Sequence, residues 1–339
     1  MNIALIGIGM VAGTHVAAVK DSSGLTLSGV LGRDIGKVQV FAQKIGASKV
    51  YRDASEVATD RTVDFAIIAT PPDQRRDLVE QLSAAGKPIL MEKPIERTLD
   101  AATEIVSLCA QRDVCLGIVF QHRARAASQA LKSALANGVL GDVVSVELRV
   151  PWWRDQAYYD APGRGSYARD GGGAMINQAI HTLDLLLWLL GPMSEVQALM
   201  TTTDLHEMEA EDWAAALFRM ECGAVGSLMA TTSAFPGGSE SVTMHGTRAV
   251  AHLADGVLTL TDLGGRVETF GAEAATGGGA DPMAFTHAWH QTVIEDFAAA
   301  LRSGSDPLAT GRSALMAHAV IAAMEEASRT RQMTKVPRV

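Results

Sequence analysis

The chain has 339 residues, of which 47% are hydrophobic and 20% are charged, and its net charge at pH 7 is −9. A chain of this length exceeds one ordinary hydrophobic core, so two domains are expected. The acidic balance and the lack of any long basic run argue against a surface that binds nucleic acid.

No segment has the features of a signal peptide or a membrane span. The first apolar run has no basic leader and is interrupted by Gly7 and Gly9, and no unbroken stretch of about 18 apolar residues follows. Cys109, Cys115 and Cys222 are an odd number of cysteines without the spacing of metal ligands. We therefore expect reduced thiols, no metal site and a cytoplasmic protein.

The first third of the chain alternates short apolar runs with helix-length segments. Buried strands are predicted at 3–7, 25–32, 63–71, 88–94 and 115–120. Helices are predicted after the first strand and at 35–46, 73–86 and 98–113. This alternation is typical of a parallel, doubly wound α/β sheet and indicates a first domain over residues 1–123.

The pattern changes in a second domain, residues 124–339. Strands separated by short turns are predicted at 143–150, 213–220, 224–233, 240–247 and 256–262, which indicates a large, open, mostly antiparallel sheet. Helices are predicted at 126–137, 174–190, 285–302 and 312–330, and the last is a candidate to pack back on the first domain. The Gly/Ala-rich segment 271–284 is expected to be a mobile loop and a candidate lid.

A glycine-rich turn follows the first strand. Gly7, Gly9 and Ala12 fit the pattern G-x-G-x-x-G/A at the junction of a strand and a helix. Glycines there permit a tight turn and let backbone N–H groups approach a pyrophosphate at the helix N-terminus. The sequence therefore predicts a dinucleotide-binding loop, to which Met10 and Val11 also belong.

The residues after the second strand bear on the choice of nucleotide. This chain has Gly32-Arg33-Asp34 there. Gly32 leaves room, and Arg33 suits a 2′-phosphate or a stacked adenine, so NADP is favoured over NAD. A solvated surface arginine fits the same pattern.

Five segments occur together in a specific order. They are GIGMVA (7–12), ATPP (69–72), AGKPILMEKP (85–94), GGGAMINQAIHTLD (171–184) and FAAALRSGSDP (297–307). On these segments the chain resembles the Gfo/Idh/MocA family of oxidoreductases over essentially its whole length. The resemblance implies a Rossmann domain followed by an α/β domain with a large open sheet. It also implies nicotinamide-dependent oxidation of a secondary alcohol, usually on a sugar or cyclitol.

The resemblance assigns roles to individual residues. Lys93 matches the E-K-P lysine that hydrogen-bonds the reacting hydroxyl, and the peptide bond to the following Pro94 is often cis in such proteins. His181 matches the general acid/base, and Asp184 matches the acid of H-x-x-D, for which an orienting role is expected. Further cofactor contacts are expected from Thr70, Pro71, Pro72, Glu92, Lys93, Pro94 and Gln121.

The chain departs from the family pattern at two places. Asn177 stands where inositol-dehydrogenase-like members usually have Asp. Because Asn cannot accept a proton, Asn177 is expected to hydrogen-bond substrate in the catalytic centre instead of relaying protons. Thr70-Pro-Pro-Asp-Gln-Arg75 stands where the family often has T-P-N-x-x-H, so the cofactor contacts there are expected to differ.

The predicted helix over 174–190 is mostly apolar, yet it carries Asn177, His181 and Asp184. In an α-helix these residues lie at about 0°, 40° and −20°, which is one narrow face. Such a stripe is either a satisfied network within the core or a surface that faces a ligand. The ligand-facing alternative is favoured, with Gly171–Gly173 allowing the chain to pass close to the ligand.

The segment 151–173 is rich in aromatic and arginine residues. It contains five of the chain's nine Trp and Tyr residues, and it is expected either to bind a sugar or to pack a domain junction. Guanidinium groups there suit hydroxyls or a carboxylate. Substrate contacts are expected from Lys93, Arg123, Trp153, Arg154, Tyr158, Arg164, Asn177 and His181. His122, His287 and His290 are left as either site residues or structural residues.

These observations predict an oxidoreductase that transfers a hydride between NADP or NAD and a secondary alcohol or ketone of a sugar, sugar acid or cyclitol. One alternative is an NAD-dependent glycosidase with transient redox chemistry. Another is a non-catalytic dinucleotide-binding sensor, which would not need both Lys93 and His181. The expected partners are a small-molecule substrate and further copies of the chain, as a homodimer or homotetramer formed through the second sheet, with no nucleic acid and no membrane.

Overall fold

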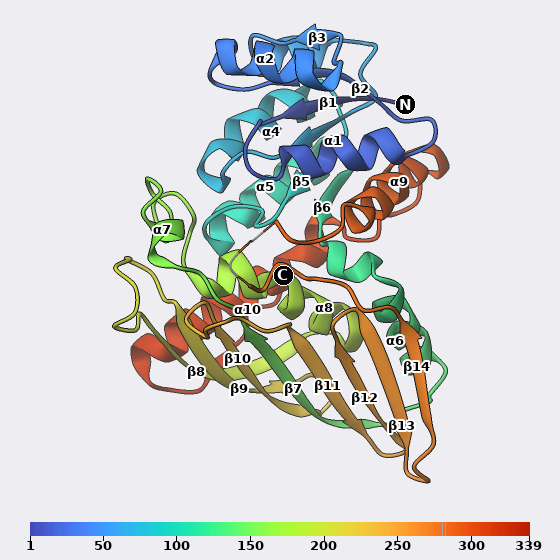
Figure 1. Cartoon of the computed structure of the whole chain (residues 1–339), viewed down its shortest axis with the longest axis vertical. Helices are drawn as coiled ribbons and strands as arrows, with labels where there is room; N and C mark the ends of the chain where they lie inside the picture. The colour runs from blue at the N-terminus through green and yellow to red at the C-terminus, as the bar shows by residue number, and fades with distance from the viewer. Residues whose placement is uncertain (280, 282) are drawn as a thin grey trace. The chain divides into compact units, whose positions relative to one another are not determined.

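The computed structural model describes residues 1–339 except 280 and 282. The chain forms two compact units (Figure 1). The first contains residues 1–96, 100–121 and 287–314, and the second contains residues 97–99, 122–286 and 315–339. The main division thus lies close to residue 123, but a segment near the C-terminus also belongs to the first unit.

The first unit is built on a parallel sheet, as predicted. In the described part of the chain its six strands have the order β3-β2-β1-β4-β5-β6. They are β1 (Asn2–Ile6), β2 (Thr26–Leu31), β3 (Lys49–Val50), β4 (Phe65–Ile68), β5 (Ile89–Glu92) and β6 (Leu116–Val119). Its helices include α1 (Ala12–Asp21), α2 (Ile35–Ile45), α3 (Ala54–Thr59), α4 (Arg75–Ala84) and α5 (Leu99–Gln111). The strand order reverses between β1 and β4, and ligands of such sheets bind at the carboxyl ends of the strands at this point.

The helix that returns to the first unit is α9 (Ala288–Ser303), which contacts α1 and β6. It buries an apolar stripe that includes Val293, Ile294 and Phe297. The helix expected to pack back was 312–330; α10 (Gly311–Thr330) belongs to the second unit from Leu315 onward, and its packing on the first domain stays a prediction.

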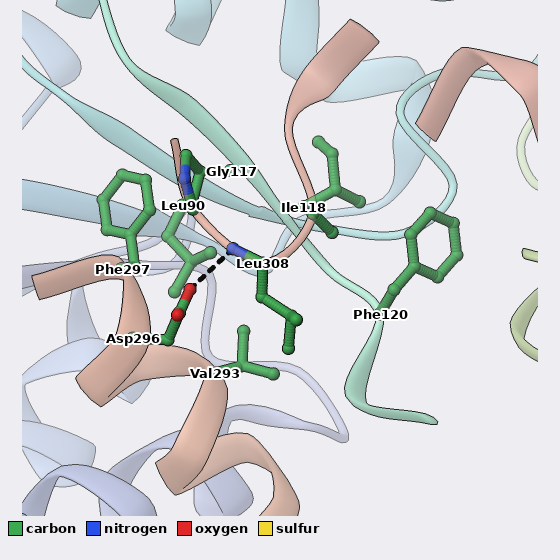
Figure 2. Close-up of a pocket in the computed structure, with 10 residues that line it drawn as sticks. Leu90, Gly117, Ile118, Phe120, Val293, Asp296, Phe297 and Leu308 are labelled. Carbon is green, nitrogen blue, oxygen red and sulfur yellow. Dashed lines mark hydrogen bonds between the residues drawn. The ribbon is translucent and has the colours of Figure 1, made fainter. Parts of the chain in front are cut away.

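A small apolar pocket lies between β5, β6 and α9 (Figure 2). Its polar member, Asp296, accepts a hydrogen bond from the backbone N–H of Leu308 at 2.7 Å. Gly117 and Phe297 also line it, and the Phe297 ring stacks edge-on against Phe65 with centroids 5.2 Å apart. The pocket holds none of the predicted site residues and reflects packing of α9 on the sheet.

Replacing Gly117 with Ala is expected to destabilise the first unit. A Cβ atom at Gly117 would lie 2.6 Å from Cδ2 of Phe297, which is too close for carbon atoms, so the helix or the ring must shift. Overpacking of this kind costs about 1–3 kcal/mol, which urea denaturation would measure. Gly13→Ala is the control, because a Cβ atom on this helical glycine has no atom within 4 Å. Equal stability of the two variants would contradict the prediction.

The second unit contains the large open sheet. Among the described residues, nine strands have the order β14-β13-β12-β11-β7-β10-β9-β8-β15. The strands are β7 (Val143–Pro151), β8 (Met193–Thr201), β9 (Trp213–Met220), β10 (Val225–Thr231), β11 (Ser241–Gly246), β12 (Ala249–Ala254), β13 (Val257–Asp262), β14 (Val267–Gly271) and β15 (Thr334–Lys335). The pair β7–β10 is parallel and the other described pairs are antiparallel, which confirms a mostly antiparallel sheet.

Helices cover one face of this sheet. On β7, buried Val146, Leu148 and Val150 alternate with exposed Glu147 and Arg149. Helix α8 (Ile180–Leu190) contacts β7 and β11, and α6 (Ala126–Ala136) contacts β12, β13 and β14. A single turn of helix, α7 (Gln156–Tyr159), lies in the aromatic segment. Among the described residues, no helix combines the length and the apolar character needed to cross a membrane.

Candidate active site

The glycine loop lies where β1 ends and α1 begins. Gly7 has φ of +104°, and a Cβ atom there would lie 2.7 Å from the carbonyl oxygen of Ala69. At Gly9 the corresponding position has no atom within 4 Å. Helix α1 begins at Ala12, and no described side chain caps it. The turn is therefore closely packed on one side and open at the helix N-terminus, which suits a pyrophosphate.

Two buried polar atoms beside this loop have no hydrogen-bond partner among the described residues. They are Thr70 Oγ1 and Asp73 Oδ1, both located after β4, the strand that pairs with β1. Buried polar atoms without a partner are rare in folded proteins and call for a ligand or another explanation. A nucleotide with free hydroxyl groups would satisfy both atoms, so the residues present fit the predicted cofactor. Gln121, two residues after the end of β6, also has a buried Oε1 atom without a hydrogen-bond partner among the described residues.

Arg33 and Asp34 follow the end of β2, and the structure gives the two side chains different surroundings. Asp34 accepts a hydrogen bond from the backbone N–H of Lys37 at 3.0 Å and caps α2. Arg33 is exposed. A Cβ atom at Gly32 would lie 2.8 Å from Cγ2 of Val38, so Gly32 is needed for the packing of α2.

Lys93 directly follows β5, and its peptide bond to Pro94 is cis, as the resemblance implied. The carboxylate of Glu92 does not face solvent. It lies 2.9 Å from Nε2 of His15 on α1 and 3.6 Å from Nε2 of His290 on α9. Burial raises the pKa of Glu92, but the two imidazoles outweigh this effect and hold the pKa well below its ordinary value. The side chain of Glu92 thus links α1 and α9 to the strand that precedes Lys93, and its contact with cofactor stays a prediction.

Arg75 explains the departure from the T-P-N-x-x-H pattern. It is buried, and its guanidinium donates hydrogen bonds to the carbonyl oxygen of Thr70 at 2.7 and 3.0 Å. It also donates to the carbonyl oxygens of Glu92 and Pro94. The arginine thus fixes the backbone on both sides of Lys93, and the five-donor fork of a guanidinium is suited to such a task.

The buried His290 is expected to make the stability of the protein depend on pH. Burial lowers its pKa, with His15 and Lys93 acting in the same direction and Glu92 opposing them. The folded protein therefore favours neutral His290, and this stability is lost as the pH falls below about 6.5, the value of an unfolded histidine. Urea unfolding at several pH values from 7.5 to 5 (roughly the range of histidine titration) measures the decline.

The His290→Phe variant keeps the ring and removes the titration. We expect its free energy of unfolding to be lower overall but to fall less steeply between about pH 7 and 5. His252→Phe, at an exposed position of β12, is the matched control and should keep the wild-type slope. The same slope in both variants would contradict the role given to His290. His287, by contrast, pairs with Asp21 at 2.7 Å on the surface.

In the second unit, Gly171 and Gly173 pass close to protein backbone. A Cβ atom at Gly173 would lie 1.7 Å from the carbonyl oxygen of Glu211, and one at Gly171 would lie 2.5 Å from Cα of Arg97. The carboxylate of Glu211 accepts hydrogen bonds from the N–H groups of Gly173 at 3.1 Å and Met175 at 2.9 Å. Gly171 and Gly173 therefore permit a close approach to residues of the same unit, and the predicted approach to a ligand stays a prediction.

The polar stripe does not lie on one regular helix. Residues Met175–Ala179 form a π-helical turn, and α8 follows. Asn177 donates hydrogen bonds to the carbonyl oxygens of Gly172 at 2.8 Å and Gly173 at 3.1 Å. The angles of a 3.6-residue helix therefore do not apply across this segment, and π-helical turns are frequent at functional sites.

His181 and Asp184 of the polar stripe contact the residues that follow β6. Asp184 forms a buried ion pair with Arg123, with hydrogen bonds of 2.6 and 2.8 Å. Burial raises the pKa of Asp184 above its ordinary value, and the guanidinium opposes this rise. The ring of His181 stacks on His122 with centroids 5.0 Å apart, and Nε2 of His122 lies 3.7 Å from Glu240. Asp184 and Arg123 thus form a buried ion pair, and the contact of Arg123 with substrate stays a prediction.

Several members of the aromatic segment have structural contacts. Arg154 is buried and donates hydrogen bonds to the carbonyl oxygens of Trp153, Gly277 and Gly279. Its contacts are therefore with protein carbonyls, where substrate hydroxyls were expected. Trp152 and Tyr159 are buried, and their polar atoms bond Glu240 and Thr232. Trp153, Tyr158 and Arg164 remain partly exposed.

The bonds from Arg154 also bear on the Gly/Ala-rich segment 271–284. The carbonyl oxygen of Gly278 accepts a further hydrogen bond from the backbone N–H of Trp153 at 2.9 Å. Residues 277–279 are therefore attached to the aromatic segment. The proposal of a lid also involves residues 280 and 282, which lie outside the described residues.

Sequence reasoning missed Arg75, His15 and Glu211, which place the backbone of predicted site residues. The signal for Arg75 was its position in the altered T-P-P-D-Q-R segment. His15 and Glu211 carry no local signal, because their partners are distant in the sequence. Among the described residues, no cluster of three His, Cys, Asp or Glu side chains has an arrangement that could hold a metal ion.

Two family models match the chain in the order of its two halves. Residues 1–120 match the oxidoreductase family with an NAD-binding Rossmann fold, and residues 128–252 match the GFO/IDH/MocA C-terminal domain. The chain belongs to the Gfo/Idh/MocA family of oxidoreductases. It is thus an NAD(P)-dependent dehydrogenase that acts on CH–OH groups.

Relatives of this family are similar along almost the whole chain. D-apiose dehydrogenase of Rhizobium rhizogenes is 26% identical, with 96% of this chain and 94% of that protein covered. Inositol 2-dehydrogenase of Rhizobium meliloti is 25% identical, with 98% and 99% covered. The crystal structure of the WlbA dehydrogenase from Bordetella pertussis, in complex with NADH and UDP-GlcNAcA, has a TM-score of 0.84 at 26% identity and covers 99% of both chains.

Proposed function

We propose that this Gfo/Idh/MocA protein transfers a hydride between nicotinamide and a secondary alcohol or ketone of a sugar, sugar acid or cyclitol. The observation that carries the proposal is the fixed position of Lys93 at the carboxyl end of β5. Arg75 holds the carbonyl groups on either side of it, and the carboxylate of Glu92 is held by His15 and His290. Because the backbone on both sides of Lys93 is held in place, the residue is suited to donate a hydrogen bond to a reacting oxygen from a fixed position.

The residues of each unit supply different parts of the reaction. When bound, the nicotinamide accepts or returns the hydride. The loop 7–12 would hold the pyrophosphate. Lys93 would donate a hydrogen bond to the reacting hydroxyl and stabilise negative charge that develops on it. His181 would take the proton, and Asn177 would hydrogen-bond the substrate.

The proposal is tested with a panel of aldoses, uronic acids, polyols and cyclitols, read by absorbance of reduced nicotinamide. Oxidation of a panel member with saturation kinetics would support the assignment. Cleavage of a glycoside without net change in absorbance would favour the glycosidase alternative. Tight nucleotide binding without any turnover would favour the sensor.

We further propose that the adenosine site prefers NADP. Asp34 is engaged as the cap of α2, and Arg33 is exposed beside it. Arg33→Ala is expected to raise the Kd for NADPH by roughly 10- to 100-fold, the value of a charge-assisted hydrogen bond, and to change the Kd for NADH by less than about twofold. Fluorescence titration with both nucleotides measures this. Equal effects on both, or tighter NADH binding by the wild type, would contradict the preference.

We also propose that the open face of the second sheet binds a second copy of the chain, as the resemblance implies. Leu199 on β8 and Leu217 on β9 are 57% and 61% exposed on that face. Light scattering coupled to gel filtration should give a multiple of the chain mass of 35.8 kDa, and a monomer at micromolar concentration would contradict this.

A further inference from the structure

A group of polar side chains surrounds the ring of Tyr158 in the second unit. The guanidinium of Arg164 lies 4.7 Å from the ring centroid, and that of Arg154 lies 5.6 Å from it. The Tyr158 hydroxyl lies 3.4 Å from Nε2 of Gln178. Gln178 belongs to the π-helical turn, next to Asn177 and three residues before His181. The ring thus connects the aromatic segment to the turn that leads into α8, the helix that carries the proposed acid/base.

Two atoms of this group are buried without a hydrogen-bond partner among the described residues. They are Nε of Arg164, which is a donor, and Oε1 of Gln178, which is an acceptor. Gln178 is only 5% exposed. Because the Tyr158 hydroxyl can either donate or accept, one polar atom of the Gln178 amide stays unsatisfied in either orientation of the amide. A buried donor and a buried acceptor that both lack a partner indicate a ligand that can accept one hydrogen bond and donate another.

Arg164 differs from the other arginines of the segment. Arg154 is surrounded by carbonyl oxygens, and Arg169 donates to the carbonyl oxygen of Pro162 at 2.6 Å. Arg164 has one loose ion pair, 3.9 Å from Asp170, whose carboxylate already accepts a hydrogen bond from Gly165 N–H at 3.0 Å. The side chain of Arg164 is also 22% exposed, so it is accessible from solvent.

We propose that the substrate carries a carboxylate, which Arg164 binds, and a neighbouring hydroxyl, which Gln178 binds. The edge of a guanidinium matches the two oxygens of a carboxylate, and an aromatic face suits the C–H face of a sugar ring. Together these groups select a sugar acid or a carboxylated cyclitol over a neutral sugar. This inference rests on the proposed dehydrogenase function and makes its substrate class specific.

The test compares acids with neutral sugars of the same ring. The probes are D-glucuronate and D-galacturonate, D-glucose and D-galactose, and D-glucose 6-phosphate as a different anion. We expect kcat/KM for at least one uronate to exceed that for its neutral counterpart by roughly 10- to 100-fold, as a charge-assisted hydrogen bond predicts. Preference for the neutral sugar or for the phosphate ester would overturn the proposal.

Two variants separate a binding role from a structural one. Arg164→Met is expected to raise KM for the uronate by a similar roughly 10- to 100-fold and to affect the neutral sugar much less. Arg169→Met removes a charge from the same segment and should keep the preference for the acid. Equal losses on acid and neutral sugar in Arg164→Met would show a structural role and overturn the proposal.

Calorimetry with the nucleotide-loaded protein distinguishes this proposal from the proposed function. If no sugar is oxidised but a uronate binds, and Arg164→Met abolishes that binding, the carboxylate subsite stands and the dehydrogenase assignment fails. If neutral sugars are oxidised and no carboxylated probe binds more tightly than they do, the dehydrogenase assignment stands and the subsite is wrong.

Discussion

Replacing Lys93 with Met is expected to lower kcat by about 10²- to 10⁴-fold on the true substrate, the usual effect of removing a group that assists proton transfer. The loss should appear in kcat more than in KM, because the ammonium acts most strongly on charge that develops in the transition state. Steady-state kinetics at saturating nucleotide measures both. The control is Lys44→Met, an exposed lysine in the last turn of α2 that should leave both constants unchanged.

The same experiment shows whether Lys93 and His181 act on one hydroxyl. Groups that act as a unit give losses that are far from additive. We therefore expect His181→Asn to cost as much as Lys93→Met, and the double variant to be little worse than either single variant. Losses that multiply would mean that the residues act in separate steps. Near-normal turnover in both single variants would remove the dehydrogenase mechanism altogether.

The sequence predicts the first unit well because its strands are buried on both faces and its helices have a regular period. Each apolar run between 3 and 120 overlaps a strand of the parallel sheet. In the second unit, short turns were predicted between strands, and the structure has tight hairpin turns with left-handed residues at Gly223 and at Asp255-Gly256. These features depend on local patterns, which a single sequence carries in full.

Strands at the edges of the second sheet were harder to predict. Every residue of β14 is exposed, so it lacks the alternation that marks a half-buried strand. The other edge strand, β15, and the edge strand β3 of the first sheet have two residues each, which is too short to show a period. The inner strands β8 and β12 of the second sheet were not predicted either. The π-helical turn at Met175–Ala179 changes which side chains share a face, and no sequence period reveals it.

In the candidate site too, residues that belong to short motifs were predicted, and contacts between residues distant in the sequence were not. Gly7, Lys93 and the cis bond to Pro94 were predicted because short motifs carry them. The contacts that hold them were not predicted, because Arg75 reaches Glu92 and Pro94 across 17 and 19 residues of sequence and His15 reaches Glu92 across 77. The fold decides which arginines bond to other protein groups and which stay accessible. The sequence alone therefore could not distinguish Arg123 and Arg154, which bond to protein groups, from the more accessible Arg164.

The ion pair of Arg123 and Asp184 gives the largest expected effect on stability. The side chains of Arg123 and Asp184 are 2% and 1% exposed, and their hydrogen bonds are 2.6 and 2.8 Å long. Asp184→Asn removes the carboxylate that pairs with this buried guanidinium, which is expected to lower the free energy of unfolding by about 3–5 kcal/mol. Urea denaturation at neutral pH measures the change, and a loss below about 1 kcal/mol, as surface ion pairs give, would show that the site is more hydrated than its burial indicates.

Replacing both partners separates the structural role of the pair from a role in the reaction. The Arg123→Met and Asp184→Leu double variant removes both buried charges, and such replacements are often neutral or even stabilising, so we expect most of the lost stability to return. If turnover returns together with stability, the ion pair serves to hold α8 in place. Asp184 then orients His181 only through the position of that helix. If stability returns while kcat stays low, the carboxylate or the guanidinium acts on the reaction itself, which would support the predicted contact of Arg123 with substrate.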